Sequence, residues 1–190
     1  MATAGPNAPG TMANDSAVGS HTWSTPNNSK VSDNTYTTSS ASFVADTNYL
    51  KATNFGFAIP SGATINGVSV SFERKKVVGA PNSVSDSVVK LVKGGTVSGT
   101  NKSAGATWDN TEGTVTFGGA ADLWGLTLTD TDVNASTFGV VLSATMDAII
   151  GKSACVAYVD FISITIDYTV GGGGGLSIPV AMQSYRRRRV

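Results

Sequence analysis

Apolar and polar side chains alternate along two long segments of the chain. In "TINGVSVSFERKK" (64–76), Val68, Val70 and Phe72 alternate with serine and glutamate, and a period of two is the pattern of a strand with one buried and one wet face. In "CVAYVDFISITIDYT" (155–169), the first half is apolar on both faces and the second half alternates isoleucine with polar residues. The sequence therefore predicts two long strands, with 155–169 in the centre of its sheet.

Shorter segments continue the strand pattern. "DSVVKLVKGG" (86–95) ends in a two-glycine turn, "TVTFGG" (114–119) also ends in glycine, and "STFGVVLSATM" (136–146) carries apolar residues at alternate positions. The one helical candidate is "LTDTDVNAS" (128–136), in which Thr129 is placed to cap a short turn. Strands at this spacing with glycine-rich turns predict an all-β fold, an antiparallel β-sandwich that is jelly-roll-like.

The two ends of the chain differ from this body. Residues 1–20 hold alanine, glycine, proline, asparagine and serine with almost nothing apolar, which predicts an extended N-terminal arm. Residues 21–170 form the predicted sandwich, and 23–43 are expected to be loop with one or two edge strands. Residues 171–190 begin with five glycines, a flexible linker, and are predicted to be an extended C-terminal arm.

Composition and charge fit one β-rich domain and argue against a nucleic-acid-binding fold. Of the 190 residues, 41% are hydrophobic and only 14% are charged. The net charge is zero, but Arg186–Arg189 supply four of the 13 basic residues, so the rest of the chain is mildly acidic. A nucleic-acid-binding domain usually has a basic folded face. Contact with nucleic acid is therefore expected only through the arginines.

Redox and targeting features are sparse. The single cysteine, Cys155, lies in an apolar stretch and is expected to be a small buried hydrophobe. The N-terminal segment lacks the basic and apolar regions of a signal peptide, and no apolar run approaches the ~20 residues of a membrane span. The chain is therefore expected to be made in a cytoplasm and to have no membrane partner.

Catalytic and metal-binding chemistry finds little support. His21 is the one histidine and is expected to be an exposed bystander, so a serine or cysteine nucleophile has no obvious base. A glycosidase pair of carboxylates and calcium ligation by the 130–132 segment remain as candidates, although loop carboxylates and a charged helix start are the ordinary interpretations. No catalytic residue, cofactor or metal is expected. The carboxylates concerned are Asp122, Asp130, Asp132 and Asp160.

Three tryptophans raise a sugar-binding alternative. Trp23, Trp108 and Trp124 stand in "SHTWSTP", "GATWDNTEG" and "ADLWGLTL", and an exposed indole can stack on the apolar face of a sugar. A tryptophan at a strand end is more often a core or rim residue of a sandwich. A structural role is favoured for each, and glycan contact stays the alternative.

The C-terminal segment combines an apolar strip with a basic tip. In "GLSIPVAMQSYRRRR", apolar residues alternate with small or polar ones, and Pro179 restricts the strip to a sheet edge or a groove. Such a strip gains from adding to another subunit, and the arginines would meet an acidic surface or phosphate. A solvated tail is the alternative. The predicted partner-binding residues are Leu176, Ile178, Val180, Met182, Tyr185, Arg186, Arg187, Arg188 and Arg189.

Four motifs stand out within residues 47–168: "TNYLKATNFGFAIPSGATINGV", "LVKGG", "DLWG" and "AYVDFISITIDY". With these motifs, the stretch resembles a family of small β-sandwich proteins encoded by tailed bacteriophages and prophages. It implies a non-enzymatic virion structural protein, and the terminal arms favour one attached to the head, a decoration (cement) protein or a short head fibre. The family pattern supplies no catalytic residues, and a shared fold does not determine function.

The main prediction from the sequence is therefore a phage virion protein that docks to the capsid through its arms. Its expected partners are the major capsid protein or another virion protein, together with further copies of itself, a trimer being the preferred assembly. The alternative is a host-surface or glycan-binding module of a tail or fibre. The two differ in whether function needs the C-terminal arm or the tryptophans.

Overall fold

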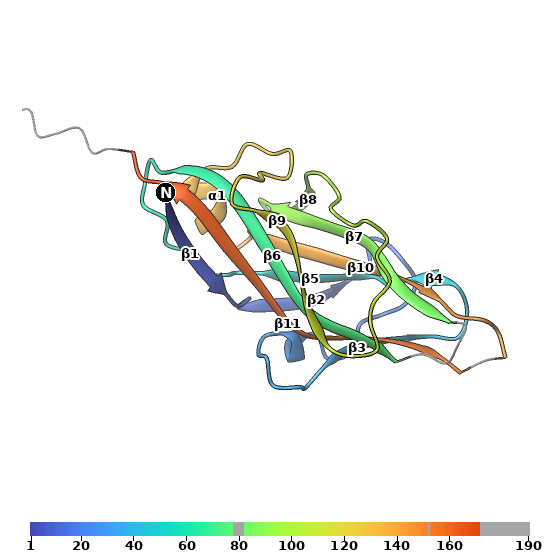
Figure 1. Cartoon of the computed structure of the whole chain (residues 1–190). Coiled ribbons are helices and arrows are strands. Elements are labelled where there is room, and N and C mark those ends of the chain that lie inside the picture. Colours follow the sequence, from blue (N-terminus) through green and yellow to red (C-terminus); the bar gives the residue numbers. More distant parts are fainter. Residues whose placement is uncertain (78–81, 152, 172–190) are drawn as a thin grey trace, which may run out of the picture.

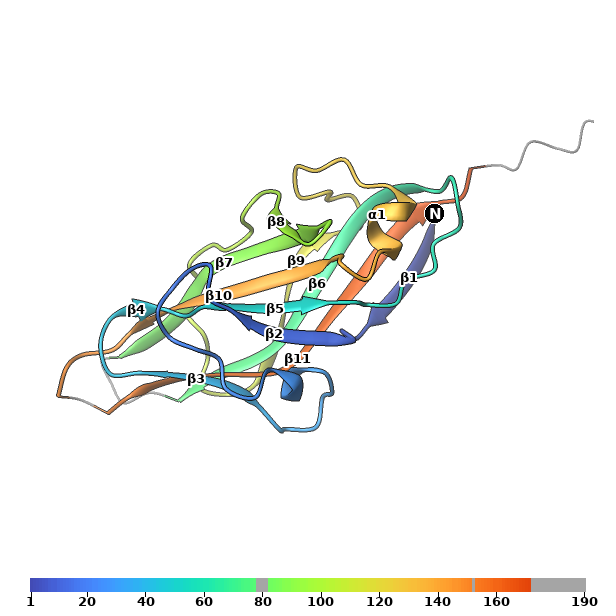
Figure 2. The same cartoon turned by 180° about the vertical axis from the view of Figure 1, so that it is seen from behind.

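Two antiparallel β-sheets, packed face to face, form the body of the computed structural model (Figure 1 and Figure 2). The structure describes residues 1–77, 82–151 and 153–171. Sheet A has the strand order β1-β11-β6-β9, and β3 pairs with the first part of β11. Its strands are β1 (Ala2–Asn7), β3 (Thr37–Ala41), β6 (Thr64–Val77), β9 (Gly113–Gly119) and β11 (Cys155–Thr169).

Sheet B has the order β2-β5-β10-β7-β8, and β4 pairs with β10. The chain passes from one sheet to the other at most of its connections, as in a jelly roll. The predicted all-β antiparallel sandwich is confirmed. The strands of sheet B are β2 (Thr11–Asp15), β4 (Ala45–Asp46), β5 (Tyr49–Thr53), β7 (Ser83–Lys93), β8 (Thr96–Ser98) and β10 (Gly139–Asp147).

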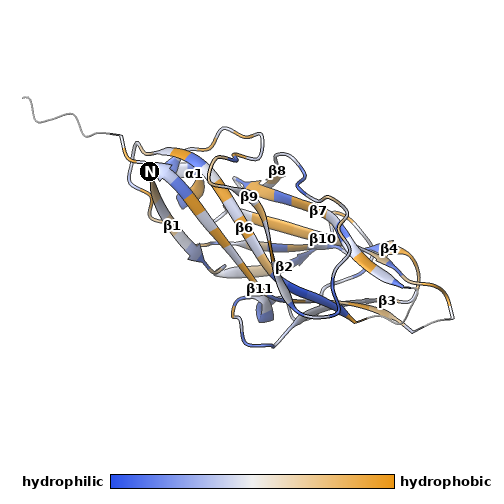
Figure 3. Ribbon diagram, viewed as in Figure 1, coloured by the Kyte–Doolittle hydropathy of each residue, from blue (hydrophilic) through white to orange (hydrophobic). Residues whose placement is uncertain are grey.

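Alternation along the strands builds the core between the sheets, and Figure 3 shows the resulting bands along β6 and β11. Phe72 lies opposite Ile162 and Val70 opposite Ile164 on neighbouring strands, and all four side chains are fully buried. The predicted strands 64–76 and 155–169 correspond to β6 and β11. As predicted, β11 is central, because it pairs with β1, β3 and β6.

The predicted turn and helix are also present. β7 turns into β8 through Gly94 and Gly95, whose φ angles of 57° and 82° lie in the left-handed region that glycine adopts readily. The short helix α1 (Asp130–Asn134) begins after Thr129, its N-cap. A 3-10 turn, η1 (Pro26–Ser29), precedes β3. None of the helices in the described part of the chain is long and apolar enough to cross a membrane.

The N-terminal segment corrects one expectation. Ala2 lies opposite Tyr168 in sheet A, and Met12 lies opposite Ala52 in sheet B with only 8% of its surface exposed. An arm outside the sandwich is therefore wrong for residues 2–15, which contribute one strand to each sheet. Both strands are edge strands. Glycine, proline and polar side chains are tolerated there, because an edge strand pairs with a neighbour on one side only.

Candidate functional site

All three tryptophans belong to the core. Trp23, Trp108 and Trp124 are 3%, 2% and 0% exposed. Each indole N–H donates a hydrogen bond inside the protein. Trp23 donates to the Asn48 carbonyl at 2.8 Å. Trp108 donates to Asp86 Oδ1 at 2.9 Å, and Trp124 to the Val68 carbonyl at 2.9 Å. The alternative that these rings face a glycan is wrong, because neither their faces nor their polar atoms reach solvent. Their structural role is confirmed.

The predicted partner-binding residues of the C-terminal arm lie outside the described residues. The described chain ends at Gly171, directly after β11. Their proposed contacts with a partner stay predictions. The residues concerned are Leu176, Ile178, Val180, Met182, Tyr185, Arg186, Arg187, Arg188 and Arg189.

Three of the four carboxylates considered for catalysis or calcium have structural partners. Asp122 pairs with Lys102 at 2.7 Å, and Asp132 pairs with Lys93 at 3.1 Å while its carboxylate accepts the Thr129 N–H. Asp160 is 1% exposed, so it is not the loop carboxylate that was expected. Among residues 1–77, 82–151 and 153–171, no group of three or more histidine, cysteine, aspartate or glutamate residues is arranged to hold a metal ion.

The remaining single candidates also have structural surroundings. Cys155 is fully buried, as predicted, and burial raises the pKa of its thiol. His21 differs from the expected exposed bystander. It is half-buried, and its ring lies 4.9 Å from that of Phe43. Its Nε2 is buried and has no hydrogen-bond partner among the described residues.

Two half-exposed tyrosines form a platform on the outer face of sheet A. Tyr158 projects outward from β11, and Tyr36 comes from the loop before β3. The two rings meet edge to face, with centroids 5.4 Å apart and an interplanar angle of 89°. Lys75, on β6, donates a hydrogen bond to the Tyr36 hydroxyl at 2.7 Å, and its ammonium lies 4.0 Å from the Tyr36 ring centroid. We call Tyr36, Lys75 and Tyr158 the tyrosine platform.

Buried polar groups hold the loop that carries Tyr36. Asp160 sits at an irregularity in β11, and its Oδ2 accepts the N–H of Asn34 at 3.1 Å. The Asn34 side chain in turn accepts a hydrogen bond from the Tyr36 hydroxyl at 3.1 Å. Ser29, fully buried in η1, donates to the Val159 carbonyl at 3.0 Å. These bonds attach the loop to β11 and give the Tyr36 ring a defined position.

Charges around the platform balance one another. The hydrogen bond from Lys75 lowers the pKa of Tyr36, but partial burial and the Glu112 carboxylate outweigh it, so the pKa lies above its ordinary value. The hydrogen bond to Tyr36 and the negative charge of Glu112 raise the pKa of Lys75. At neutral pH Tyr36 is therefore a neutral phenol and Lys75 a cation, and the charge of Glu112 acts on both.

Hydroxyl side chains surround the tyrosine platform. Thr38 lies opposite Tyr158, and Ser40 opposite Val156, across the β3–β11 pair. Farther along the same face, Ser71 and Thr116 share a hydrogen bond at 2.8 Å. This face therefore offers two aromatic rings beside many groups that donate and accept hydrogen bonds.

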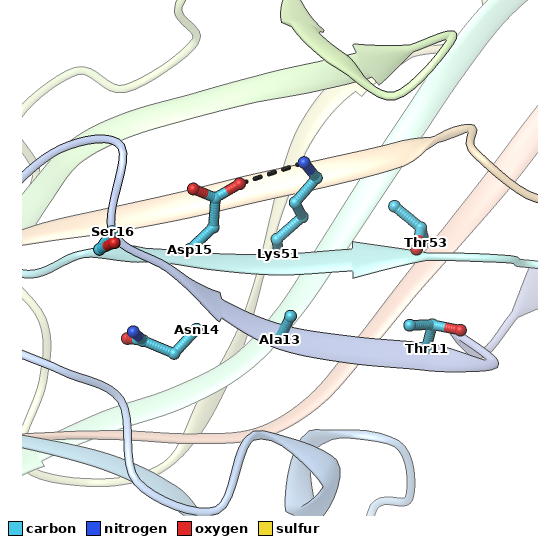
Figure 4. Close-up of a pocket in the computed structure, with 7 residues that line it drawn as sticks. All are labelled: Thr11, Ala13, Asn14, Asp15, Ser16, Lys51 and Thr53. Atoms are coloured by element: carbon cyan, nitrogen blue, oxygen red, sulfur yellow. Dashed lines mark hydrogen bonds and ion pairs between the residues drawn. The ribbon is translucent and has the colours of Figure 1, made fainter.

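Apart from the tyrosine platform, a hollow of about 470 Å³ lies on the outer face of sheet B over β2 and β5 (Figure 4). Lys51 and Asp15 form an ion pair across it at 3.1 Å, and the hydrogen bond from Lys51 lowers the pKa of Asp15. Its lining is polar and contains no aromatic ring, so it lacks the stacking surface of the tyrosine platform. The lining residues are Thr11, Ala13, Asn14, Asp15, Ser16, Lys51 and Thr53.

Sequence reasoning missed both tyrosines of the platform. Tyr158 falls in the half of 155–169 that is apolar on both faces, which hides its outward direction. Tyr36 falls in "NTYTTSS", where Tyr36, Thr38 and Ser40 share one face of a strand while Thr37 and Ser39 are buried on the other. The signal that could have found it is this period of two within a polar run.

Comparisons with known proteins show only distant similarity to solved structures. No family model matches the chain, and no curated protein matches it. A solved structure described as "CBM4 structure and function" covers 73% of this chain and 87% of its own, at 10% identity and a TM-score of 0.39. The family 11 carbohydrate-binding module of a cellulosomal cellulase of Clostridium thermocellum covers 82% of this chain and 85% of its own, at 14% identity and a TM-score of 0.33.

Proposed function

We propose that this chain is a non-catalytic glycan-binding module that holds sugars on the outer face of sheet A. The observation that carries the proposal is the tyrosine platform, a pair of half-exposed tyrosine rings on a sheet face lined with hydroxyl groups. Sugars present apolar C–H faces and polar hydroxyl edges, so they need a surface that offers both. A tyrosine has a large apolar ring with a polar tip and suits this task.

The polar groups beside the rings suit sugar hydroxyls. Lys75 is a donor, the Glu112 carboxylate is an acceptor, and Thr38 and Ser40 provide hydroxyls that do both. Binding sites generally combine apolar surface with a few placed polar groups in this way.

Binding to a glycan array tests the proposal. The full chain is expected to bind at least one oligosaccharide, and Tyr158→Ala to lose that binding because the ring is removed. Tyr158→Phe keeps the ring and is expected to retain most of the signal. Tyr168→Ala makes the same change at the far end of β11, where the side chain packs against the core; it is expected to lower stability and leave binding intact. If no glycan binds, or if Tyr158→Ala binds as well as the unaltered chain, the proposal fails.

A second candidate function is attachment to a virion through the C-terminal segment. It is supported by the resemblance of residues 47–168 to phage β-sandwich proteins and by the apolar and basic pattern of 176–189. The placement of the chain end is compatible with it. β11 runs from the tyrosine platform to Thr169, on the order of 35 Å at ~3.3 Å per residue, and the N-terminus lies at that same far end (Figure 1). A segment anchored there would leave the tyrosines at a distance from the anchor.

Truncation separates the two functions. A chain that ends at Val170 is expected to bind glycans like the full chain but to lose co-sedimentation with empty heads of the phage that carries its gene. Equal co-sedimentation of both chains would contradict attachment through the segment.

The expected trimer is measured by light scattering, which would give about three times the 19.4 kDa of one chain. A mass of one chain at working concentration would contradict it.

A further inference from the structure

A small, partly open cavity lies at the start of the edge strand β9. Its volume is about 110 Å³, well above the roughly 10–15 Å³ that a single water needs. Arg74, Trp108, Asp109, Gly113 and three threonines are among the residues that line it. The combination of an indole, a guanidinium, a carboxylate and hydroxyl groups offers both apolar and hydrogen-bonding surface.

Buried charges make the wall of this cavity rigid. Arg74 is 5% exposed, pairs with Asp86 of sheet B, and lies 4.6 Å from the centroid of the Trp108 ring. Asp86 also accepts the Trp108 indole N–H. Burial lowers the pKa of Arg74 to about 10, so the guanidinium stays charged at neutral pH. Arg74, whose guanidinium has five N–H donors, thus lines a site whose geometry is set by the pairing of the two sheets.

The charge balance disfavours an anionic ligand. The positive charge of Arg74 is met by the paired carboxylate of Asp86, and Asp109 adds a second carboxylate in the lining. The cavity and its wall therefore carry a net negative charge, which disfavours an anion such as a sugar acid or a phosphate. A neutral, hydroxyl-rich ring fits the remaining donors and acceptors.

The cavity lies next to the tyrosine platform. Arg74 and Lys75 are neighbours on β6 and point to opposite faces of sheet A. The turn that precedes β9 carries Asp109 in the cavity lining and Glu112 beside Lys75. β9 and β11 lie on either side of β6, so the distance between them is two strand spacings, about 10 Å. A short oligosaccharide bridges this distance around the edge of the sheet.

We propose that this cavity takes the terminal unit of a neutral sugar chain whose following units lie on the tyrosine platform. The proposal rests on the glycan-binding function and names its ligand: a neutral chain end, and not the interior of a polymer or an acidic glycan. Trp108 borders this cavity, but its ring is buried and its N–H is used inside the protein, so it reports on a bound sugar without stacking on it.

Two glycine variants of the same strand test the cavity. Gly113 lies opposite Arg74, so a side chain added there points toward the cavity, and its Cβ would meet nothing within 4 Å. Gly119 also meets nothing within 4 Å, but it lies at the other end of β9. Gly113→Leu therefore fills the cavity mouth, and Gly119→Leu is its matched control.

The binding probes are cellotetraose, maltotetraose, xylotetraose and mannotetraose, with tetragalacturonate as the acidic probe, measured by calorimetry. At least one neutral probe is expected to bind. Gly113→Leu should weaken it by about tenfold, as expected for one or two lost hydrogen bonds, and Gly119→Leu should not. Binding by Gly113→Leu within twofold of the unaltered chain, or stronger binding of tetragalacturonate, overturns the proposal. If the unaltered chain binds no probe, the glycan-binding function itself fails.

The indole N–H signals in an NMR spectrum give a second readout. Methyl glucoside, methyl mannoside and methyl xyloside, each at high concentration, are the probes. At least one probe is expected to shift the Trp108 signal of the unaltered chain, with the Trp23 and Trp124 signals as internal controls. The same probe is expected to leave the Trp108 signal of Gly113→Leu unchanged. The cavity would not be a sugar site if no probe shifts the Trp108 signal while Tyr158→Ala still abolishes tetrasaccharide binding. That result would leave the proposed function of the tyrosine platform intact.

Discussion

At the tyrosine platform, two aromatic rings of the same type differ in how they are held. Tyr158 is fixed by the backbone of β11, whereas Tyr36 depends on side-chain contacts with Asn34, Asp160 and Lys75. Loss of any of these contacts is expected to free the Tyr36 ring before it affects Tyr158. The position of Tyr36 is therefore the more sensitive part of the site.

The tryptophans give a prediction about stability. Trp124 is fully buried and its N–H donates to the Val68 carbonyl, so Trp124→Ala is expected to lower the free energy of unfolding by about 3–5 kcal/mol. Urea unfolding followed by circular dichroism measures this. A loss below about 1 kcal/mol would contradict the assignment of Trp124 to the core.

Asp122 gives a prediction about pH. The hydrogen bond from Lys102 lowers the pKa of Asp122 below its ordinary value of about 3.9. A carboxyl whose pKa is lower in the folded state stabilises the fold above about pH 4, and this contribution is lost as pH falls through the lowered pKa. The unaltered chain should therefore be more stable than Asp122→Asn at pH 6, and the gap should narrow at pH 3. A gap in the free energy of unfolding that is equal at both pH values would contradict this.

At the scale of elements, the strands that the sequence predicts are those whose alternation is strong. β6 and β11 are long enough to repeat the pattern many times, and Gly94 and Gly95 provide a turn with its own chemistry. β1 and β2 escape prediction because their apolar residues are few and they gain stability by completing sheets made by distant segments. Pairing of Ala2 with Tyr168 is a tertiary contact that no local pattern contains.

The helix α1 shows the opposite case, in which a local signal is sufficient. Thr129 accepts the Asp132 N–H at 3.1 Å, and Asp132 accepts the Thr129 N–H at 2.9 Å, which is a capping box. Thr129→Ala is expected to lower the free energy of unfolding by about 1 kcal/mol. Thr129→Ser keeps the hydroxyl and is expected to change it much less. Equal losses in the two variants, measured by thermal unfolding, would contradict the cap.

At the scale of the whole molecule, the site depends on elements that are far apart in the sequence. The sequence predicted the sandwich, but its alternative of sugar contact considered only the tryptophans, because a bulky aromatic residue does not reveal by itself which face of a strand it occupies. The outward direction of Tyr158 follows from the register of β11 with β3 and β6. The cavity at Arg74 follows from the pairing of two sheets, which composition and spacing do not contain.

The whole molecule also has two distinct ends. The tyrosine platform lies near the start of β11, and the described chain leaves the sandwich after the end of the same strand. Glycan binding at one end and attachment at the other are therefore compatible in one chain. We expect Tyr158→Ala to remove the proposed glycan binding alone, and truncation after Val170 to remove the proposed attachment alone.

A chemical-shift map of the full chain with the strongest tetrasaccharide tests the central claim most directly. The account predicts that backbone amides of β3, β6, β9 and β11 around Tyr36, Lys75 and Tyr158 shift most, and that the outer face of sheet B does not respond. Shifts gathered over Thr11, Asp15 and Lys51 would instead place the ligand in the hollow on sheet B (Figure 4). That result would contradict the tyrosine platform as the glycan-binding site.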